Sequence, residues 1–110
     1  MSLKKSVVVT LQVEGVHYWE DCPIPEVAFL KNLHRHIFHI KAMKTVQHND
    51  RDIEIIMLKR HMLAYLDEFG NNFGNRSCED IAEELIETFD LLNCEVLEDG
   101  ENGAYLWRVQ

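Results

Sequence analysis

The sequence predicts an α+β fold, with a four-stranded antiparallel sheet and two helices packed on one face of it. Three observations predict this fold. Two early segments alternate apolar and polar residues, two later segments carry apolar residues at helical spacing, and two short apolar segments near the end flank a turn. The predicted order is ββααββ. With 110 residues and no linker or internal repeat, the chain is expected to form a single domain, residues 1–110.

The first predicted strand is Lys5 to Glu14, where apolar residues recur at every second position. The segment from Gly15 to Asn32 contains Pro23 and Pro25, which interrupt regular structure, and is predicted to be a long loop. The apolar residues of the strand that share one face are Val7, Val9, Leu11 and Val13.

The second predicted strand is Leu33 to Met43. Because side chains alternate along a strand, its odd- and even-numbered residues lie on opposite faces. One face carries His34, His36, Phe38 and Ile40. The other face carries Leu33, Arg35, Ile37 and His39.

The first predicted helix is Asp52 to Phe69, with Asp50 or Asp52 as its N-cap and Gly70 at its end. Its apolar residues at helical spacing are Ile55, Leu58, Met62, Tyr65, Leu66 and Phe69.

A polar loop, Asn71 to Arg76, is predicted to separate the two helices. Ser77 resembles an N-cap, with Asp80 three residues later as a capping-box partner. The second helix then continues through apolar residues as far as Leu92.

Asn93 to Leu97 and Ala104 to Val109 are predicted to be two short strands. The residues between them, 98–103, read Glu-Asp-Gly-Glu-Asn-Gly, which is typical of a hairpin turn.

Composition excludes several classes of function. The chain has 11 Lys and Arg residues against 19 Asp and Glu residues, a net charge of −8. This balance disfavours binding to nucleic acid or to anionic membranes. The sequence contains no apolar run long enough to cross a bilayer. Its three cysteines form no CxxC pair, so we expect neither a disulfide framework nor a zinc ribbon, and we expect a cytoplasmic protein.

Three histidines form the clearest candidate site. His34 and His36 are two residues apart on a strand and therefore point the same way. His17 follows the first strand, and in an antiparallel pair the end of one strand lies near the start of the next. Three imidazoles with an open fourth position are typical of a catalytic zinc site. The alternative is that these are ordinary surface or core histidines.

Three further segments extend the pattern. The first, Glu54-Ile55-Ile56-Met57-Leu58-Lys59, is similar to the motif D-F-x-x-L-K. The second, Ser77-Cys78-Glu79, is similar to a Pro-Thr-(Ser)-Glu type segment. The third, Val96-Leu97-Glu98-Asp99, is similar to a strand that ends in Glu-Thr. In this order, together with the three histidines, they resemble the tunnelling fold of 6-pyruvoyltetrahydropterin synthase and 6-carboxytetrahydropterin synthase. The resemblance runs from the first strand to Trp107.

The resemblance implies roles for particular residues. His17, His34 and His36 match the zinc ligands of the family, and Glu98 matches the residue that anchors the pterin ring. A single carboxylate can accept hydrogen bonds from the adjacent ring N–H and amino group of a pterin, which supports the role of Glu98. For an unrelated chain we would interpret Glu98 as an ordinary turn carboxylate beside Asp99.

The catalytic residues of the family are incompletely matched. Its cysteine, four residues before the H-x-H pair, is replaced by Leu30, and Cys22 in the same loop is either a substitute or an incidental cysteine. Its Leu-Asp-His segment corresponds to Leu66-Asp67-Glu68. The resemblance therefore implies Asp67, with Glu68 or Cys22, as proton-transfer groups. Two other histidines are alternative proton carriers, His48 and His61.

Two functions follow as expectations. The first is a zinc-dependent carbon–oxygen lyase that acts on 7,8-dihydroneopterin triphosphate or a related pterin. The second is a catalytically inactive protein on the same fold that binds a pterin or purine, or is purely structural. In both cases the resemblance implies a homo-oligomer, a trimer or hexamer whose sheets close into a barrel with sites between subunits. Basic residues of a neighbouring copy would then bind the triphosphate of the substrate, and the candidates are Lys31, Arg35 or Arg51.

Overall fold

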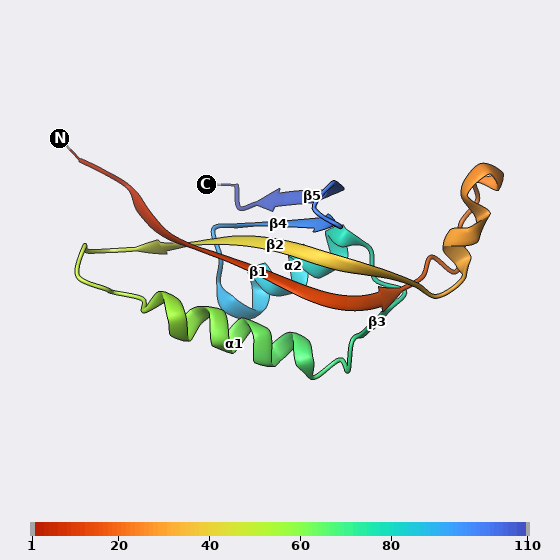
Figure 1. Ribbon diagram of the computed structural model, residues 1–110. Coiled ribbons are helices and arrows are strands. Elements are labelled where there is room, and N and C mark those ends of the chain that lie inside the picture. Colours follow the sequence, from red (N-terminus) through yellow and green to blue (C-terminus); the bar gives the residue numbers. More distant parts are fainter. Residues whose placement is uncertain (1, 110) are drawn as a thin grey trace.

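Two long strands, β1 (Lys5–His17) and β2 (His34–Val46), form the centre of the sheet in the computed structural model, which describes residues 2–109 (Figure 1). They pair antiparallel without a break from Lys5↔Val46 to His17↔His34. Both extend three residues beyond their predicted ends, because strand pairing continues through Gly15 on one side and Val46 on the other. The inward alternation is confirmed by four buried side chains, those of Val9, Leu11, Phe38 and Ile40.

The predicted hairpin near the end of the chain is confirmed. β4 (Asn93–Glu98) pairs antiparallel with both β2 and β5 (Asn102–Trp107). Asp99 and Gly100 have φ values of +55° and +73°, and the backbone N–H of Glu101 donates to the carbonyl of Glu98 at 3.0 Å. Glycine adopts such a φ without strain and Asp tolerates it better than most residues, so the pair allows the tight reversal.

The prediction of a four-stranded antiparallel sheet was wrong. The segment predicted to be a polar loop contains a short strand, β3 (Asn72–Gly74), which pairs parallel with β1 at Val16 and His17. The sheet is therefore five-stranded and mixed, in the order β3-β1-β2-β4-β5. Three residues are too few to show a two-residue period, so the strand is defined by its partner rather than by its own sequence.

Helix α1 (Ile55–Asp67) begins later than predicted. Its N-cap is Glu54, whose carboxylate accepts from the backbone N–H groups of Ile56 and Met57, so neither Asp50 nor Asp52 has that role. Asp52 instead accepts from the backbone of Gln47 in the preceding turn. The residues that α1 buries are Leu58, Met62 and Leu66.

Helix α2 (Cys78–Phe89) begins as predicted. Ser77 accepts from the backbone of Asp80, and the Asp80 side chain accepts from the backbone of Ser77, which completes a capping box. The helix ends at Phe89, before Leu92, because Asp90 adopts a left-handed conformation. The buried faces of α1, α2, β1, β2 and β4 form one core.

The loop between β1 and β2 holds a short 3₁₀ segment, η1 (Pro25–Lys31), that projects from one end of the sheet (Figure 1). Pro25 lies in its first turn. Backbone N–H groups at this position have no partner within the helix, so the N–H that proline lacks costs no hydrogen bond. The backbone N–H of Trp19 donates to the carbonyl of Leu30 at 2.7 Å, which closes the base of the loop. No helix within residues 2–109 is long and apolar enough to span a membrane.

Gly15 leaves room for two aromatic rings beneath the end of β1. A Cβ atom built there would lie 2.9 Å from Cδ2 of Phe73 and 3.3 Å from Cε2 of Phe38. These rings meet edge to face, with centroids 5.1 Å apart, and both are fully buried. The absence of a side chain at Gly15 therefore lets Phe73 of β3 pack directly against the central strands.

We expect Gly15→Ala to lower the free energy of unfolding by roughly 1–3 kcal/mol, because the added methyl group overpacks the Phe73 ring. Urea denaturation followed by circular dichroism measures this loss. Gln12→Ala, at an exposed position of the same strand, is the control and should change stability by less than about 0.5 kcal/mol. If both variants are equally stable, Phe73 does not pack over Gly15 as described.

Candidate metal centre

Three imidazoles meet where β1 ends and β2 begins. The strand register places His17 directly opposite His34, and His36 lies two residues further along the same face of β2. The ring centroid of His17 lies 4.5 Å from that of His34 and 5.3 Å from that of His36, and the last two are 5.1 Å apart. The structure thus brings together the three histidines that the sequence singled out.

Each of the three rings has its Nδ1 atom bound by an oxygen on the outside of the cluster. Nδ1 of His17 lies 2.8 Å from the carbonyl oxygen of Arg76, and Nδ1 of His34 lies 2.8 Å from that of Asn32. Nδ1 of His36 lies 2.7 Å from a carboxylate oxygen of Asp99. Carbonyl oxygens and ionised carboxylates only accept, so each Nδ1 must donate. In the neutral rings the Nε2 atoms then carry free lone pairs.

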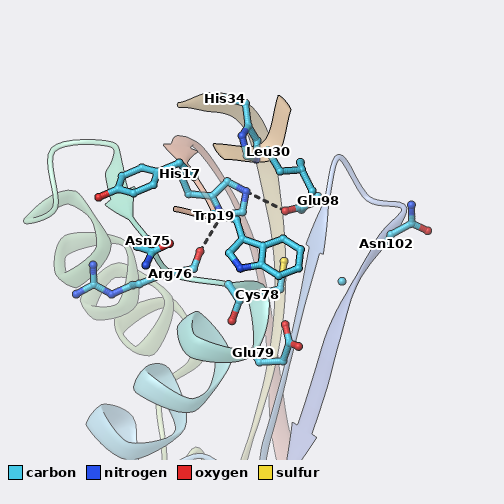
Figure 2. Close-up of a pocket in the computed structure, with 13 residues that line it drawn as sticks. His17, Trp19, Leu30, His34, Asn75, Arg76, Cys78, Glu79, Glu98 and Asn102 are labelled. Carbon is cyan, nitrogen blue, oxygen red and sulfur yellow. Dashed lines mark hydrogen bonds and ion pairs between the residues drawn. The ribbon is translucent and has the colours of Figure 1, made fainter. Parts of the chain in front are cut away.

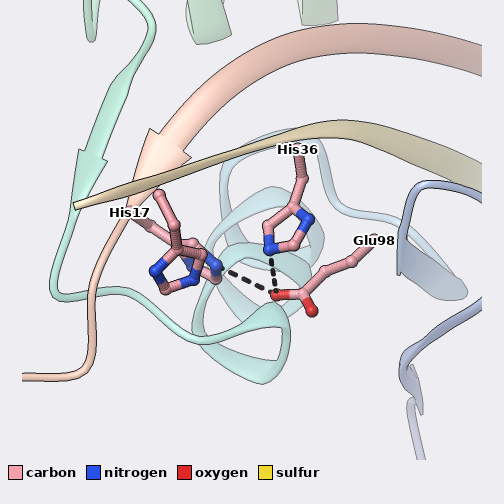
Figure 3. A group of neighbouring side chains, drawn as sticks. His17, His36 and Glu98 are labelled. Atoms are coloured by element: carbon pink, nitrogen blue, oxygen red, sulfur yellow. Dashed lines mark ion pairs between the residues drawn. The ribbon is translucent and has the colours of Figure 1, made fainter. Parts of the chain in front are cut away.

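Glu98, at the end of β4, supplies a fourth donor atom. Its Oε2 atom lies 2.9 Å from Nε2 of His17 and 3.6 Å from Nε2 of His36 (Figure 3). One potential ligand atom from each of His17, His34, His36 and Glu98 lies within 4.8 Å of the other three. Nitrogen and carboxylate ligands at this spacing are suited to a zinc ion, which binds them at about 2.0–2.2 Å.

The cluster contains buried atoms that lack a partner. Nε2 of His17 and Nε2 of His36 are shielded from solvent and make no hydrogen bond to the described residues. Neither contact with Glu98, at 2.9 Å and 3.6 Å, is a hydrogen bond. Buried polar atoms are rarely left unsatisfied, and a cation shared by the neutral rings would satisfy both lone pairs. The donor set therefore fits a bound metal ion.

Burial opposes protonation of His17. Burial is the largest influence on His17 and lowers its pKa, although the Arg76 carbonyl and the Glu98 carboxylate act in the opposite direction. The pKa of Asp99 is lowered, first by the backbone N–H of Ile37 and then by the ring of His36. The favoured state thus has a neutral His17 and an ionised Asp99.

The unpredicted strand β3 holds the outer partner of His17. Pairing with β1 brings the chain from Gly74 to Arg76 alongside His17, with the backbone N–H of Tyr18 donating to the Gly74 carbonyl at 2.9 Å. The Arg76 guanidinium donates to Glu84 of α2 at 2.9 Å and lies 4.6 Å from the ring centroid of Phe69. Arg76 is therefore fixed at both its side chain and its backbone.

A cavity of about 350 Å³ opens beside the cluster (Figure 2). Its walls come from the end of β1, the η1 loop, the start of α2 and the β4–β5 hairpin. The residues that line it include His17, Trp19, Leu30, Cys78, Glu79 and Glu98.

The role of Cys78 in this wall was not predicted. The residue is buried in the first turn of α2, and burial, followed by the charges of Glu98 and Glu79, raises the pKa of its thiol to about 12. It is therefore a neutral thiol at physiological pH, not a nucleophile. The only sequence signal for a role of Cys78 was its place in Ser77-Cys78-Glu79, the segment that is similar to the Pro-Thr-(Ser)-Glu type segment of the family.

The three candidate proton-transfer residues lie outside the cavity lining. The Cys22 side chain is buried, and its thiol lies near the carbonyl oxygens of Ile24 and Val27, at 3.8 Å and 3.6 Å. Asp67 and Glu68 lie at the C-terminal end of α1, where Asp67 borders a different cavity, of about 330 Å³. Within one copy of the chain, none of the three residues lines the wall that His17 and Glu98 share.

The remaining histidines also lie apart from the cluster. His39 is on the opposite face of β2, packed near Gly100. His48 is exposed and lies 3.5 Å from Asp52, and His61 is exposed on α1. Leu30, at the position that the resemblance assigns to a catalytic cysteine, does line the cavity but has no group that can accept a proton.

The site thus combines a nitrogen-rich cation site with a cavity that has both acidic and apolar walls. Its donor atoms could hold a metal ion, and the cavity is large enough for a small ligand. In comparisons with known proteins, no protein-family model and no curated protein matches the chain.

Proposed function

We propose that the chain is a zinc-dependent pterin lyase similar to 6-pyruvoyl- and 6-carboxytetrahydropterin synthases, acting on 7,8-dihydroneopterin triphosphate or a related compound. The observation that carries the proposal is that His17, His34, His36 and Glu98 each offer one ligand atom within 4.8 Å of the other three. Metal binding is the part that the geometry supports most directly, and the pterin comes from the resemblance.

His17, His34 and His36 would hold the ion, and their outer hydrogen bonds would keep the rings in the tautomer that binds it. When bound, zinc supplies Lewis-acid polarisation of oxygens on the substrate side chain, which makes adjacent C–H protons easier to remove. A fourth ligand would come from Glu98 or from a substrate oxygen.

Glu98 would bind the pterin ring. A single oxygen, Oε2, makes both of its contacts with the histidines (Figure 3). To accept two hydrogen bonds from a pterin, Glu98 would turn both oxygens to the cavity and leave the ion to the three imidazoles. A carboxylate that accepts from a ring N–H and the neighbouring amino group favours a 2-amino-pyrimidinone over other planar rings. Glu79 adds a second carboxylate to the same cavity, and the Trp19 and Leu30 side chains supply its apolar walls.

Proton transfer is the incomplete part of the proposal. Leu30 lines the cavity where the resemblance expects a base, and Cys22, Asp67 and Glu68 lie elsewhere in the same copy. In an oligomer with shared sites, a neighbouring copy would supply Asp67 and Glu68. The presence of Leu30 favours a second candidate function, a metal-containing protein that binds a pterin or purine without turning it over.

Self-association follows from the free edges of the sheet. β3 pairs with β1 only at Val16 and His17, so the outer edge of β1 before these residues has no partner strand in the described chain. β5 forms the opposite edge, and it carries exposed Tyr105 and Trp107 rings with centroids 5.3 Å apart. Unpaired edges of this kind favour pairing with another chain. We propose that copies join along these edges into a barrel.

The metal prediction uses two histidines of one strand. We expect about one zinc ion per chain in purified protein. His36→Ala should lower the zinc content, because it leaves only two imidazoles and the Glu98 carboxylate to hold the ion, whereas His39→Ala on the opposite face of β2 should retain the parent content. Elemental analysis after dialysis measures both. Equal metal content in the two variants, or a metal-free parent that takes up no zinc, would contradict the site.

A second prediction concerns the ligand. Glu98→Gln should weaken pterin binding about 10- to 100-fold, since it removes a charge-assisted hydrogen bond of roughly 1.5–3 kcal/mol. Fluorescence titration with a pterin measures affinity, and product analysis with 7,8-dihydroneopterin triphosphate measures turnover. Glu101→Gln, in the same hairpin, is the matched control. If the parent protein binds the pterin but does not turn it over, the second candidate function is selected. If the parent protein neither binds nor turns over a pterin, the pterin assignment is wrong.

The assembly prediction uses the β5 edge. Light scattering should give three or six times the chain mass of 12.9 kDa. Trp107→Lys should dissociate the assembly by placing a charge on the exposed face of β5, whereas Val109→Lys, which adds the same charge outside the strand, should not. A monomeric parent protein at micromolar concentration would rule out the barrel.

A further inference from the structure

Asp99 makes three hydrogen bonds to β2 from a single turn position. Its Oδ1 atom accepts from the backbone N–H of Ile37 at 2.9 Å, and its own N–H donates to the Ile37 carbonyl at 2.8 Å. Its Oδ2 atom lies 2.7 Å from Nδ1 of His36. The residue holds this arrangement at a φ of +55°, in the left-handed region. Both carboxylate oxygens are therefore engaged, and neither points into the cavity.

The three imidazoles of the cluster differ in what holds their outer nitrogen. His17 and His34 bind backbone carbonyl oxygens, of Arg76 and Asn32, whereas His36 binds a side-chain carboxylate. A backbone carbonyl is present whichever residue stands there, but the bond to His36 depends on the identity of Asp99. A carboxylate partner also makes an imidazole a stronger metal ligand, because it fixes the tautomer and raises the basicity of the ring.

We propose that Asp99 is a positioning residue that holds His36 in its metal-binding tautomer and orientation. This inference rests on the proposed metal site and deepens it. The resemblance assigns no such role, because the family has threonine where this chain has Asp99. The role comes from the turn: Asp99 follows the last residue of β4 in a left-handed conformation, and its carboxylate bonds to His36 and Ile37 of the neighbouring strand β2.

Asp99→Asn tests the proposal with almost no change in shape. The backbone N–H of Ile37 requires an oxygen, so the amide must place its oxygen there and direct its NH₂ group at Nδ1 of His36. Nδ1 must then accept, and the ring proton moves to Nε2, where it blocks the metal. A similar amide substitution in the serine-protease triad produces a wrong histidine tautomer.

Two measurements are expected to change together. Competition with a chromophoric chelator should show zinc affinity about 10- to 100-fold weaker in Asp99→Asn than in the parent. Nitrogen-15 spectra of the metal-free proteins should show the proton of His36 on Nδ1 in the parent and on Nε2 in the variant, with His17 and His34 unchanged. Glu101→Gln, which also removes one charge from the hairpin, should match the parent in both measurements.

The outcomes separate this inference from the metal assignment. Parent-like zinc affinity and an unchanged His36 tautomer in Asp99→Asn would overturn the positioning role. Should the parent fail to bind zinc, the proposed function fails, and the tautomer of His36 still decides whether Asp99 orients the ring. Should the variant fail to fold, the parent spectrum alone decides, because a His36 proton on Nε2 in the metal-free parent refutes the proposal.

Discussion

The arrangement of the site depends on the outward hydrogen bonds of three imidazoles. Each Nδ1 atom donates to an oxygen on the outside of the cluster, so each Nε2 keeps its lone pair, and one ligand atom of each ring lies within 4.8 Å of the others and of Glu98. Because Nε2 of His17 and of His36 is shielded from solvent, it is costly to leave these two lone pairs without a proton or a cation. One side of every ring is thereby fixed by the fold, and the other side is left for a ligand.

Several elements must be in register to make those bonds. The unbroken pairing of β1 with β2 aligns His17 and His34, and β3 brings the Arg76 carbonyl to His17. Arg76 is in turn tied to α2 through Glu84. The rings of Phe38 and Phe73 support the cluster from below, packed where Gly15 has no side chain. The site is therefore supported by α2 as well as by the sheet.

The parts of the site that depend on contacts local in sequence could be predicted, and those that depend on contacts between distant segments could not. The H-x-H spacing and the antiparallel hairpin were enough to predict that His17, His34 and His36 would meet, because strand geometry is periodic. The capping box of α2 was equally local. The pairing of β3 with β1, the bond between Arg76 and Glu84, and the bonds of Asp99 to His36 and Ile37 join separate segments of the chain. No local sequence pattern predicts them.

The family resemblance was informative for some positions only. It singled out Glu98 and the segment around Cys78, and the structure places both residues at the cavity. It gave less help with Cys22, Asp67 and Glu68, since these residues lie apart from that cavity within one copy and the role of each would depend on a neighbouring copy. Quaternary contacts have no periodic trace in a single sequence, so this part of the function stays a prediction.

The placement of all three imidazoles on one hairpin has a consequence for the order of folding. His17, His34 and His36 lie on β1 and β2, so the imidazoles of the proposed metal site are all present once the first 46 residues have been synthesised and paired. Glu98 and the Arg76 carbonyl arrive only with the later half of the chain. An ion captured by the nascent hairpin would hold its two strands in register before either helix exists, so the metal would act as a folding template as well as a ligand of the finished protein.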